Sequence, residues 1–182
     1  LKWFDEFEEL IRPVKTVEDI HSAKAENRTG IIFGWQNATP IGNDLNRLNL
    51  FYELGVRVIQ ITYNERNLLG NGCYERSDDG LSRFGIAAVR EINDLGILID
   101  LSHVGDRTTL DTIEHSEHPV AITHANARSQ IDHPRNKTDE AIRMLTERGG
   151  VIGANAFPMF FDQGFESELE DYLDAIDYLV QS

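Results

Sequence analysis

A helical stretch that ends at a glycine and continues directly into an apolar strand occurs three times along this chain. The glycines are Gly55, Gly96 and Gly149, and a run of mainly apolar residues follows each of them. Glycine just after a helix commonly adopts the left-handed conformation that terminates it. A helix that repeatedly leads into a strand predicts an α/β fold with parallel strands.

Apolar and amphipathic periodicities place the expected elements. Strands are expected at 30–35, 56–62, 97–102, 119–123 and 150–156, helices at 44–54, 82–95, 106–117 and 138–148, and an acidic amphipathic helix at 165–180. No phosphate-binding glycine loop follows the first strand, which argues against an open dinucleotide-binding sheet. About five parallel β/α units therefore predict part of a TIM-type (β/α)8 barrel.

The length of the chain bounds how much of a barrel it can form. A whole barrel takes about 250 residues, and this chain has 182. We therefore expect a single domain over 1–182 that lacks N-terminal and C-terminal units. An open barrel exposes sheet edges and apolar faces, which favours homo-oligomers or poor solubility.

The excess of acidic residues limits the classes of partner that this chain is expected to bind. The formal net charge is −14 and the isoelectric point is about 4.7, which disfavours nucleic acid and anionic membrane surfaces. Cys73 is the only cysteine, so an intrachain disulfide is excluded and a reducing, cytoplasmic location is expected. No apolar stretch approaches the roughly 20 residues of a membrane span.

Two histidines end neighbouring apolar runs. His103 and His124 follow the third and fourth expected strands, and barrel enzymes place their chemistry at such C-terminal strand ends. Period-two alternation puts His103 on the face of Ile99 and Leu101, toward the barrel interior. Neutral imidazoles bind zinc, so the pair predicts a metal site. Two histidines hydrogen-bonded to loop backbone are the structural alternative.

Four further candidates lie in loops at the same end of the expected sheet. Arg135 follows His124 by eleven residues, and its guanidinium could hold a substrate carboxylate or form a salt bridge at a helix N-terminus. Tyr63 and Asn64 end the second strand, where a phenol could donate to a substrate oxygen, although aromatic packing is commoner there. Gln36 ends the first strand, and its amide is a poor bridge between metals.

The remaining polar candidates favour structural roles. His115 and His118 lie just before a strand, on the stability face of a barrel. His133 precedes Pro134 and is as well suited to shaping a turn as to binding, and His21 is expected on the surface. Asp100 points away from the histidine face by alternation, so we expect it to make structural hydrogen bonds.

Several motifs in order give the chain a family resemblance. The segments at 61–67, 80–85, 96–105, 121–127 and 133–136 together resemble the membrane dipeptidase (renal dipeptidase) family of zinc peptidases, which are metal-dependent hydrolase barrels. The resemblance implies that His103 and His124 are zinc ligands contributed by consecutive strands. It also implies that Arg135 holds the carboxylate of the dipeptide.

The chain departs from the family pattern at several places. The family's first His-x-Asp ligand pair would precede Leu1, and a late segment with a substrate-binding aspartate would follow Ser182. Spacing aligns Gln36 with the glutamate that bridges two zinc ions, and Tyr63 with a histidine that contacts substrate. The resemblance therefore implies one or two zinc ions in the full-length parent.

These observations predict a metallodipeptidase in which zinc activates water for hydrolysis of dipeptides or related small amides. Tyr63 would stabilise the oxyanion, and Asn64 remains a possible site residue. Two alternatives stay open. One is another metal-dependent amidohydrolase or lactonase. The other is a truncated, non-catalytic barrel fragment that binds metal weakly or associates with a partner.

Overall fold

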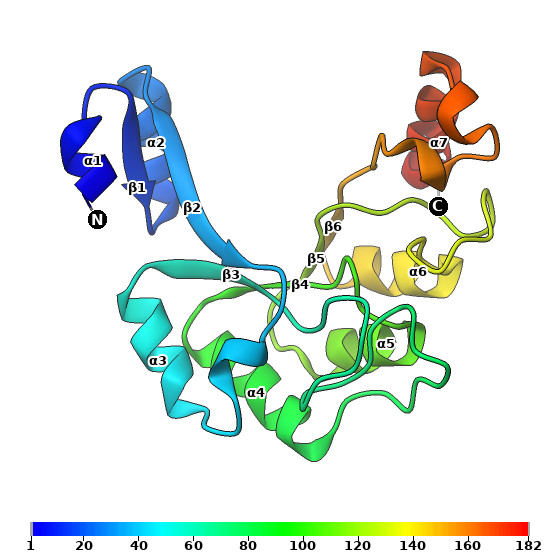
Figure 1. Cartoon of the computed structure of the whole chain (residues 1–182), viewed down its shortest axis with the longest axis horizontal. Coiled ribbons are helices and arrows are strands. Elements are labelled where there is room, and N and C mark those ends of the chain that lie inside the picture. Colours follow the sequence, from blue (N-terminus) through cyan, green and yellow to red (C-terminus); the bar gives the residue numbers. More distant parts are fainter. Residues whose placement is uncertain (1, 182) are drawn as a thin grey trace.

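One curved sheet of six parallel strands organises the computed structural model, which describes residues 2–181. The strands pair in chain order and are β1 (Ile11–Val14), β2 (Thr29–Trp35), β3 (Val56–Gln60), β4 (Leu98–Asp100), β5 (Ala121–Ile122) and β6 (Val151–Ile152). Parallel neighbours need a crossover after each strand, which is the arrangement of a barrel arc. Within the described chain β1 and β6 do not pair, so the arc stays open (Figure 1).

Helices supply the crossovers. They are α1 (Lys2–Glu6), α2 (Val17–Ala25), α3 (Asn46–Glu53), α4 (Arg83–Asp94), α5 (Asp106–His115), α6 (Asp139–Glu147) and α7 (Leu169–Gln181), with short 3-10 turns η1 (Thr39–Ile41), η2 (Pro158–Phe160) and η3 (Gly164–Glu166). The helices α3 to α6 lie along one side of the central strands, whereas the β1–β2 region and α7 rise at opposite ends (Figure 1). The predicted α/β class of a partial barrel is confirmed.

The glycines that suggested this fold have the expected conformation. Gly55, Gly96 and Gly149 follow α3, α4 and α6 with φ of 105°, 68° and 73°. These angles lie in the left-handed region, where only glycine is free of a steric penalty. The expected helix at 165–180 is found as α7, preceded by the turn η3.

The first part of the chain holds elements that the sequence analysis missed, and the strand count is six rather than five. The strand β1 has four residues including Pro13, so it shows no clear alternation. The helix α2 begins at a reciprocal capping box of Thr16 and Asp19, a sequence signature that could have revealed it.

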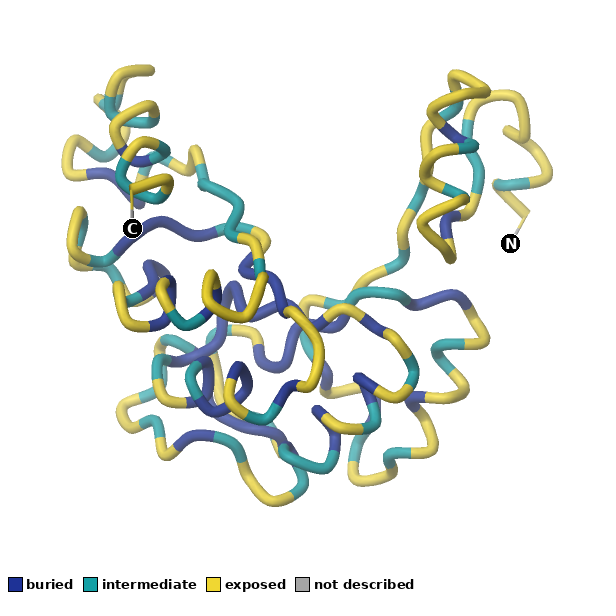
Figure 2. Tube along the Cα trace, turned by 180° about the vertical axis from the view of Figure 1, so that it is seen from behind, coloured by how far each residue is buried: buried dark blue, intermediate teal, exposed yellow. Residues whose placement is uncertain are grey.

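The apolar core lies between the central strands and the helices α3 to α6. Ile59, Ile99 and Ile122 are at most 1% exposed, and they share a cluster with Ile92 of α4 and Ile113 of α5. The two ends of the arc are largely exposed (Figure 2). The middle of the sheet is therefore the part of the described chain with a packed apolar core.

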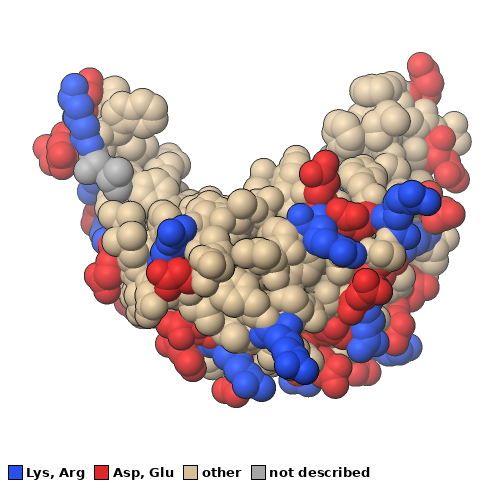
Figure 3. Space-filling model, turned by 60° about the horizontal axis from the view of Figure 1, so that its bottom comes forward, with Lys and Arg blue, Asp and Glu red and all other residues tan. Residues whose placement is uncertain are grey.

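Charged side chains are spread over the outside of the arc (Figure 3). Among the described residues, no helix combines the length and the apolar character needed to cross a bilayer.

Candidate metal centre

His103 and His124 meet where β4 and β5 end. Their Nε2 atoms are 2.9 Å apart, and the two ring planes are inclined by 62°. The backbone that orients His103 differs from the predicted continuous strand. Ile99 and Leu101 pack into the helix-facing core, and β4 ends at Asp100, so strand alternation does not extend to His103. Both histidines are therefore loop residues directed by the turns that follow the strands.

Asp100 fixes both of these turns. Its Oδ1 accepts from the backbone N–H groups of Ser102 (3.1 Å) and Thr123 (3.0 Å) and from the hydroxyl of Ser102 (2.6 Å). Its Oδ2 accepts from the hydroxyl of Thr123 at 2.7 Å. One buried carboxylate thus ties the turn before His103 to the turn before His124. The expectation of a structural hydrogen-bonding role for Asp100 is confirmed.

Hydrogen bonds at Nδ1 define the tautomers of the two histidines. The Thr123 hydroxyl proton goes to Asp100, so Thr123 Oγ1 accepts from His124 Nδ1–H at 2.8 Å. His103 Nδ1 lies 2.8 Å from Asn64 Oδ1, an oxygen that accepts only. Each Nε2 atom therefore carries a lone pair, and the two lone pairs face one another. Such an arrangement is repulsive unless a cation lies between them.

The environment keeps both imidazoles neutral. Burial, and then the charge of Arg135, lowers the pKa of His103 to about 3. Burial also lowers the pKa of His124, against the opposing charge of Asp100. Neutral imidazole is the form that coordinates a metal, so the pair has the protonation state that a metal site requires.

The donor set fits zinc in part. Zn–N bonds of about 2.0–2.1 Å in tetrahedral geometry separate two nitrogens by roughly 3.4 Å. The observed 2.9 Å is shorter by a distance that small ring rotations can supply. Within residues 2–181 no group of three or more His, Cys, Asp or Glu side chains is placed to hold an ion. The two imidazoles thus provide two of the four ligands of a tetrahedral ion.

Arg135 lies against the histidine pair. Its guanidinium donates to the carbonyl oxygens of Ser102 and His124, the latter at 3.0 Å, and lies 5.4 Å from the ring centre of Phe160. The alternative of a helix N-terminal salt bridge is not seen among the ion pairs of the described residues. Arg135 thus lies beside the two histidines, and its hydrogen bonds to the backbone carbonyls of Ser102 and His124 were not predicted from the sequence.

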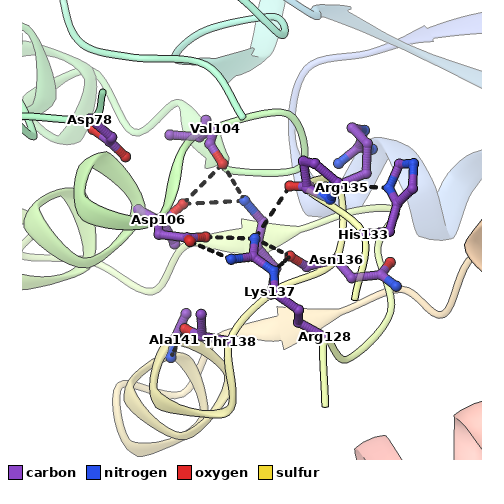
Figure 4. A network of polar contacts seen from close by, with 12 residues as sticks. Asp78, Val104, Asp106, Arg128, His133, Arg135, Asn136, Lys137, Thr138 and Ala141 are labelled. Carbon is purple, nitrogen blue, oxygen red and sulfur yellow. Dashed lines mark hydrogen bonds and ion pairs between the residues drawn. The ribbon is translucent and has the colours of Figure 1, made fainter. Parts of the chain in front are cut away.

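Lys137 is a buried cation that the sequence analysis missed. It is 1% exposed, and its Nζ donates to the carbonyl of Val104 (2.6 Å) and to the hydroxyl of Thr109 (3.2 Å) (Figure 4). Burial lowers its pKa to about 7. Val104 directly follows His103, so Lys137 fixes the loop that carries this histidine. A lysine in a polar loop gives no sequence signal of burial.

The remaining predicted residues separate into two groups. Tyr63 stacks on His103 with ring centres 4.1 Å apart, and Asn64 contacts the same imidazole. Gln36 is exposed and contributes its backbone carbonyl, which accepts from Gln60 Nε2 at 2.5 Å. The structure therefore brings Tyr63 and Asn64 to the pair, and records no contact between the Gln36 side chain and either histidine.

The other histidines take structural positions. The Nδ1 of His133 accepts from the Arg135 backbone N–H at 3.1 Å, so this residue shapes the turn, and its ring packs 4.9 Å from that of Phe160. His115 Nδ1 bonds the carbonyl of Asp111 within α5, and His21 is exposed.

The sequence of this chain matches a known family over nearly its whole length. The sequence profile of the membrane dipeptidase family, peptidase family M19, matches residues 3–182. An uncharacterized dipeptidase of Schizosaccharomyces pombe is 30% identical over 175 residues, which cover 92% of this chain and 42% of that protein.

The fold of this chain is also similar to the folds of solved structures. An amidohydrolase from Pseudomonas aeruginosa is 40% identical with a TM-score of 0.94, covering 99% of this chain and 55% of that one. A metallopeptidase from Rhodobacter sphaeroides, liganded with a phosphinate mimic of the dipeptide L-Ala-D-Ala, is 27% identical with a TM-score of 0.91, covering 99% and 54%. The chain thus spans about half the length of most of these relatives.

Proposed function

This chain belongs to the membrane dipeptidase family, peptidase family M19, and we propose on this basis that the whole protein hydrolyses dipeptides with the help of zinc. One observation carries the proposal. Two neutral imidazoles direct their Nε2 lone pairs at one another across 2.9 Å, beside the guanidinium of Arg135. A pair of ligands next to a fixed positive charge suits a substrate that has both a scissile carbonyl and a free carboxylate.

Each residue of the site has a defined task in this proposal. His103 and His124 would hold the metal, which when bound would supply a Lewis acid for the peptide carbonyl. Arg135 has five N–H donors and uses two on backbone carbonyls, so the others remain for the carboxylate of the dipeptide. The phenol of Tyr63, which is 40% exposed beside His103, would donate to the developing oxyanion.

A second reaction of the same chemical class also has support. The relative from Pseudomonas aeruginosa is called an amidohydrolase and is 40% identical, and Gln36 stands where spacing expects a metal-bridging glutamate. A panel of dipeptides, cyclic amides and lactones tested on the whole protein separates the two reactions. Turnover of dipeptides alone supports the first.

The metal site is tested directly by zinc content. We expect this chain, dialysed against zinc and then against buffer, to retain zinc, and a His103→Ala/His124→Ala variant to lose it. Elemental analysis measures both. His21→Ala is the matched control, because this histidine is exposed and is not a predicted metal ligand.

The outcomes separate clearly. Zinc that is retained by the unsubstituted chain and by His21→Ala, and is absent from the double variant, supports His103 and His124 as the metal ligands. Equal zinc in all three proteins places the ion elsewhere and overturns the assignment. Circular dichroism of each variant confirms that a loss of zinc is not a loss of fold.

A further inference from the structure

Asn64 has a left-handed backbone conformation, which most residues other than glycine and asparagine avoid. Its φ is 61°, in the left-handed region, and only one other non-glycine residue of the described chain shares a positive φ. Asparagine adopts this region more readily than other non-glycine residues, because its short amide side chain can form local hydrogen bonds. This backbone conformation occurs directly beside a candidate metal ligand, His103.

The segment Gly72–Tyr74 enforces the conformation. The Tyr74 backbone N–H donates to the Asn64 carbonyl at 2.9 Å, and the Cys73 N–H donates to the His103 carbonyl at 3.0 Å. A Cβ atom at Gly72 would lie only 2.1 Å from the Asn64 carbonyl carbon. The backbones of Asn64 and His103 are therefore attached to consecutive residues of one closely packed segment.

The side chain of Asn64 completes the connection. Its Oδ1 lies 2.8 Å from His103 Nδ1, and it also accepts from the Cys73 thiol at 3.6 Å. An acceptor at Nδ1 keeps the proton there and leaves the Nε2 lone pair directed at His124. The left-handed backbone thus presents an acceptor to Nδ1 of His103, the ring nitrogen that faces away from His124.

We propose that Asn64 is a positioning residue, which selects the Nδ1–H tautomer of His103 and aims its Nε2 at a metal ion shared with His124. This inference rests on the proposed metal site. The second histidine obtains the same tautomer differently, because His124 Nδ1 donates to Thr123, whose hydroxyl donates to Asp100. The two ligands are therefore positioned independently, one by an amide and one by a carboxylate relay.

Two substitutions isolate the amide oxygen. Asn64→Gly removes the side chain while accepting the positive φ without strain. Asn64→Asp keeps an oxygen in the same place and tolerates the same backbone region. Any effect that Asn64→Gly shows and Asn64→Asp does not is therefore an effect of the acceptor rather than of the turn.

Nitrogen NMR of histidine-labelled, metal-free protein reports the tautomer, because protonated and unprotonated ring nitrogens have distinct chemical shifts. We expect His103 to carry its proton on Nδ1 in the wild type and in Asn64→Asp, and to shift toward Nε2–H in Asn64→Gly. Competition with a chromogenic chelator then measures zinc affinity. We expect a loss of about 10- to 100-fold in Asn64→Gly and a value within a few-fold of wild type in Asn64→Asp.

The same tautomer in wild type and Asn64→Gly overturns the proposal, as does an Nε2–H tautomer in the wild type. If the tautomer shifts as expected but none of the proteins binds zinc, the proposed metal function fails and the positioning of His103 by Asn64 stands. The spectroscopic and the metal-binding measurements therefore judge the two proposals separately.

Discussion

The N-terminal arm, residues 2–33, and the central body around β3 to β6 are held together by different forces. In the arm, only Val14 and Ala23 are buried. In the body, the strand residues Ile59, Ile99 and Ile122 are almost inaccessible to water (Figure 2). Both regions have the same parallel β/α pattern. Regular secondary structure thus forms in both, whereas a packed core and a candidate site form in only one.

Polar contacts partly replace burial in the arm. Arg12 forms ion pairs with Asp19 (3.4 Å) and Glu26 (2.9 Å), and Arg28 pairs with Glu26 (2.9 Å). Ion pairs that are this accessible to solvent contribute little to stability, because water and salt screen the charges. The arm therefore has hydrogen-bonded order with little apolar stabilisation of its own, and its pairing to the body runs through β2 and β3.

The same apolar truncation in the two regions gives the largest expected contrast. Ile99→Ala in the body removes a side chain that is 1% exposed and should lower the free energy of unfolding by about 2–5 kcal/mol. Ile32→Ala in the arm removes one that is 48% exposed and should cost well under half as much. Urea denaturation followed by circular dichroism measures both. Equal losses would show that the arm is as tightly packed as the body.

A buried lysine makes the body sensitive to pH. Burial lowers the folded-state pKa of Lys137 to about 7, whereas an unfolded lysine titrates near 10.4. Between these values the unfolded chain binds more protons, so stability should rise with pH, by about 2 kcal/mol from pH 7 to 9. The charged and titratable groups around the amine are Arg135, Cys73, Asp106 and Arg128. Because Lys137 lies in the body, we expect this pH dependence in the unfolding of the body and not in the opening of the arm.

Substitution of Lys137 by methionine tests whether this lysine causes the rise in stability with pH. Lys137→Met should abolish this rise in unfolding free energy, measured by urea titration at each pH, because the neutral side chain has no proton to exchange. Lys24→Met, at an exposed position of the arm, is the matched control and should leave the rise intact. A rise that survives in Lys137→Met would assign it to another group.

The contrast between the regions also explains which features the sequence could predict. Gly55, Gly96 and Gly149 mark helix ends in the body, and the long apolar runs after them identify central strands. In the arm, β2 follows an apolar run and was predicted at 30–35, whereas β1 is interrupted by Pro13 and α2 has a single buried residue, so neither of these two elements was predicted. Strands that are buried on both faces appear in the sequence as near-continuous apolar runs, and the short, partly exposed β1 lacks this signal.

The candidate site was predictable in its residues but not in its connections. His103, His124 and Arg135 are identifiable because they follow apolar runs or match a family motif. The relay from Asp100 through Thr123 to His124, and the contact of Asn64 with His103, depend on turns whose backbone conformations leave no periodic signal. The burial of Lys137 depends on the packing of the Val104 loop, which is equally invisible in sequence.

Two helix caps provide the finest test of the comparison, because a threonine hydroxyl accepts from a backbone N–H three residues later in both regions. Thr16 Oγ1 accepts from the Asp19 N–H at 3.2 Å in the arm, and Thr138 Oγ1 accepts from the Ala141 N–H at 3.2 Å in the body. Replacing such a cap by alanine costs about 1 kcal/mol. Thr138→Ala should therefore lower the global free energy of unfolding by this amount.

Thr16→Ala should change that global value less, because an arm with little burial opens before the body unfolds. Its cost should appear instead as amide hydrogen exchange in α2 that is about fivefold faster, the equivalent of 1 kcal/mol in a local opening equilibrium. The amides of α6 serve as the internal reference. An equal loss of global stability in Thr16→Ala and Thr138→Ala would instead show that arm and body unfold as one cooperative unit. The exposed strands β1 and β2 would then need a source of stability other than their own core.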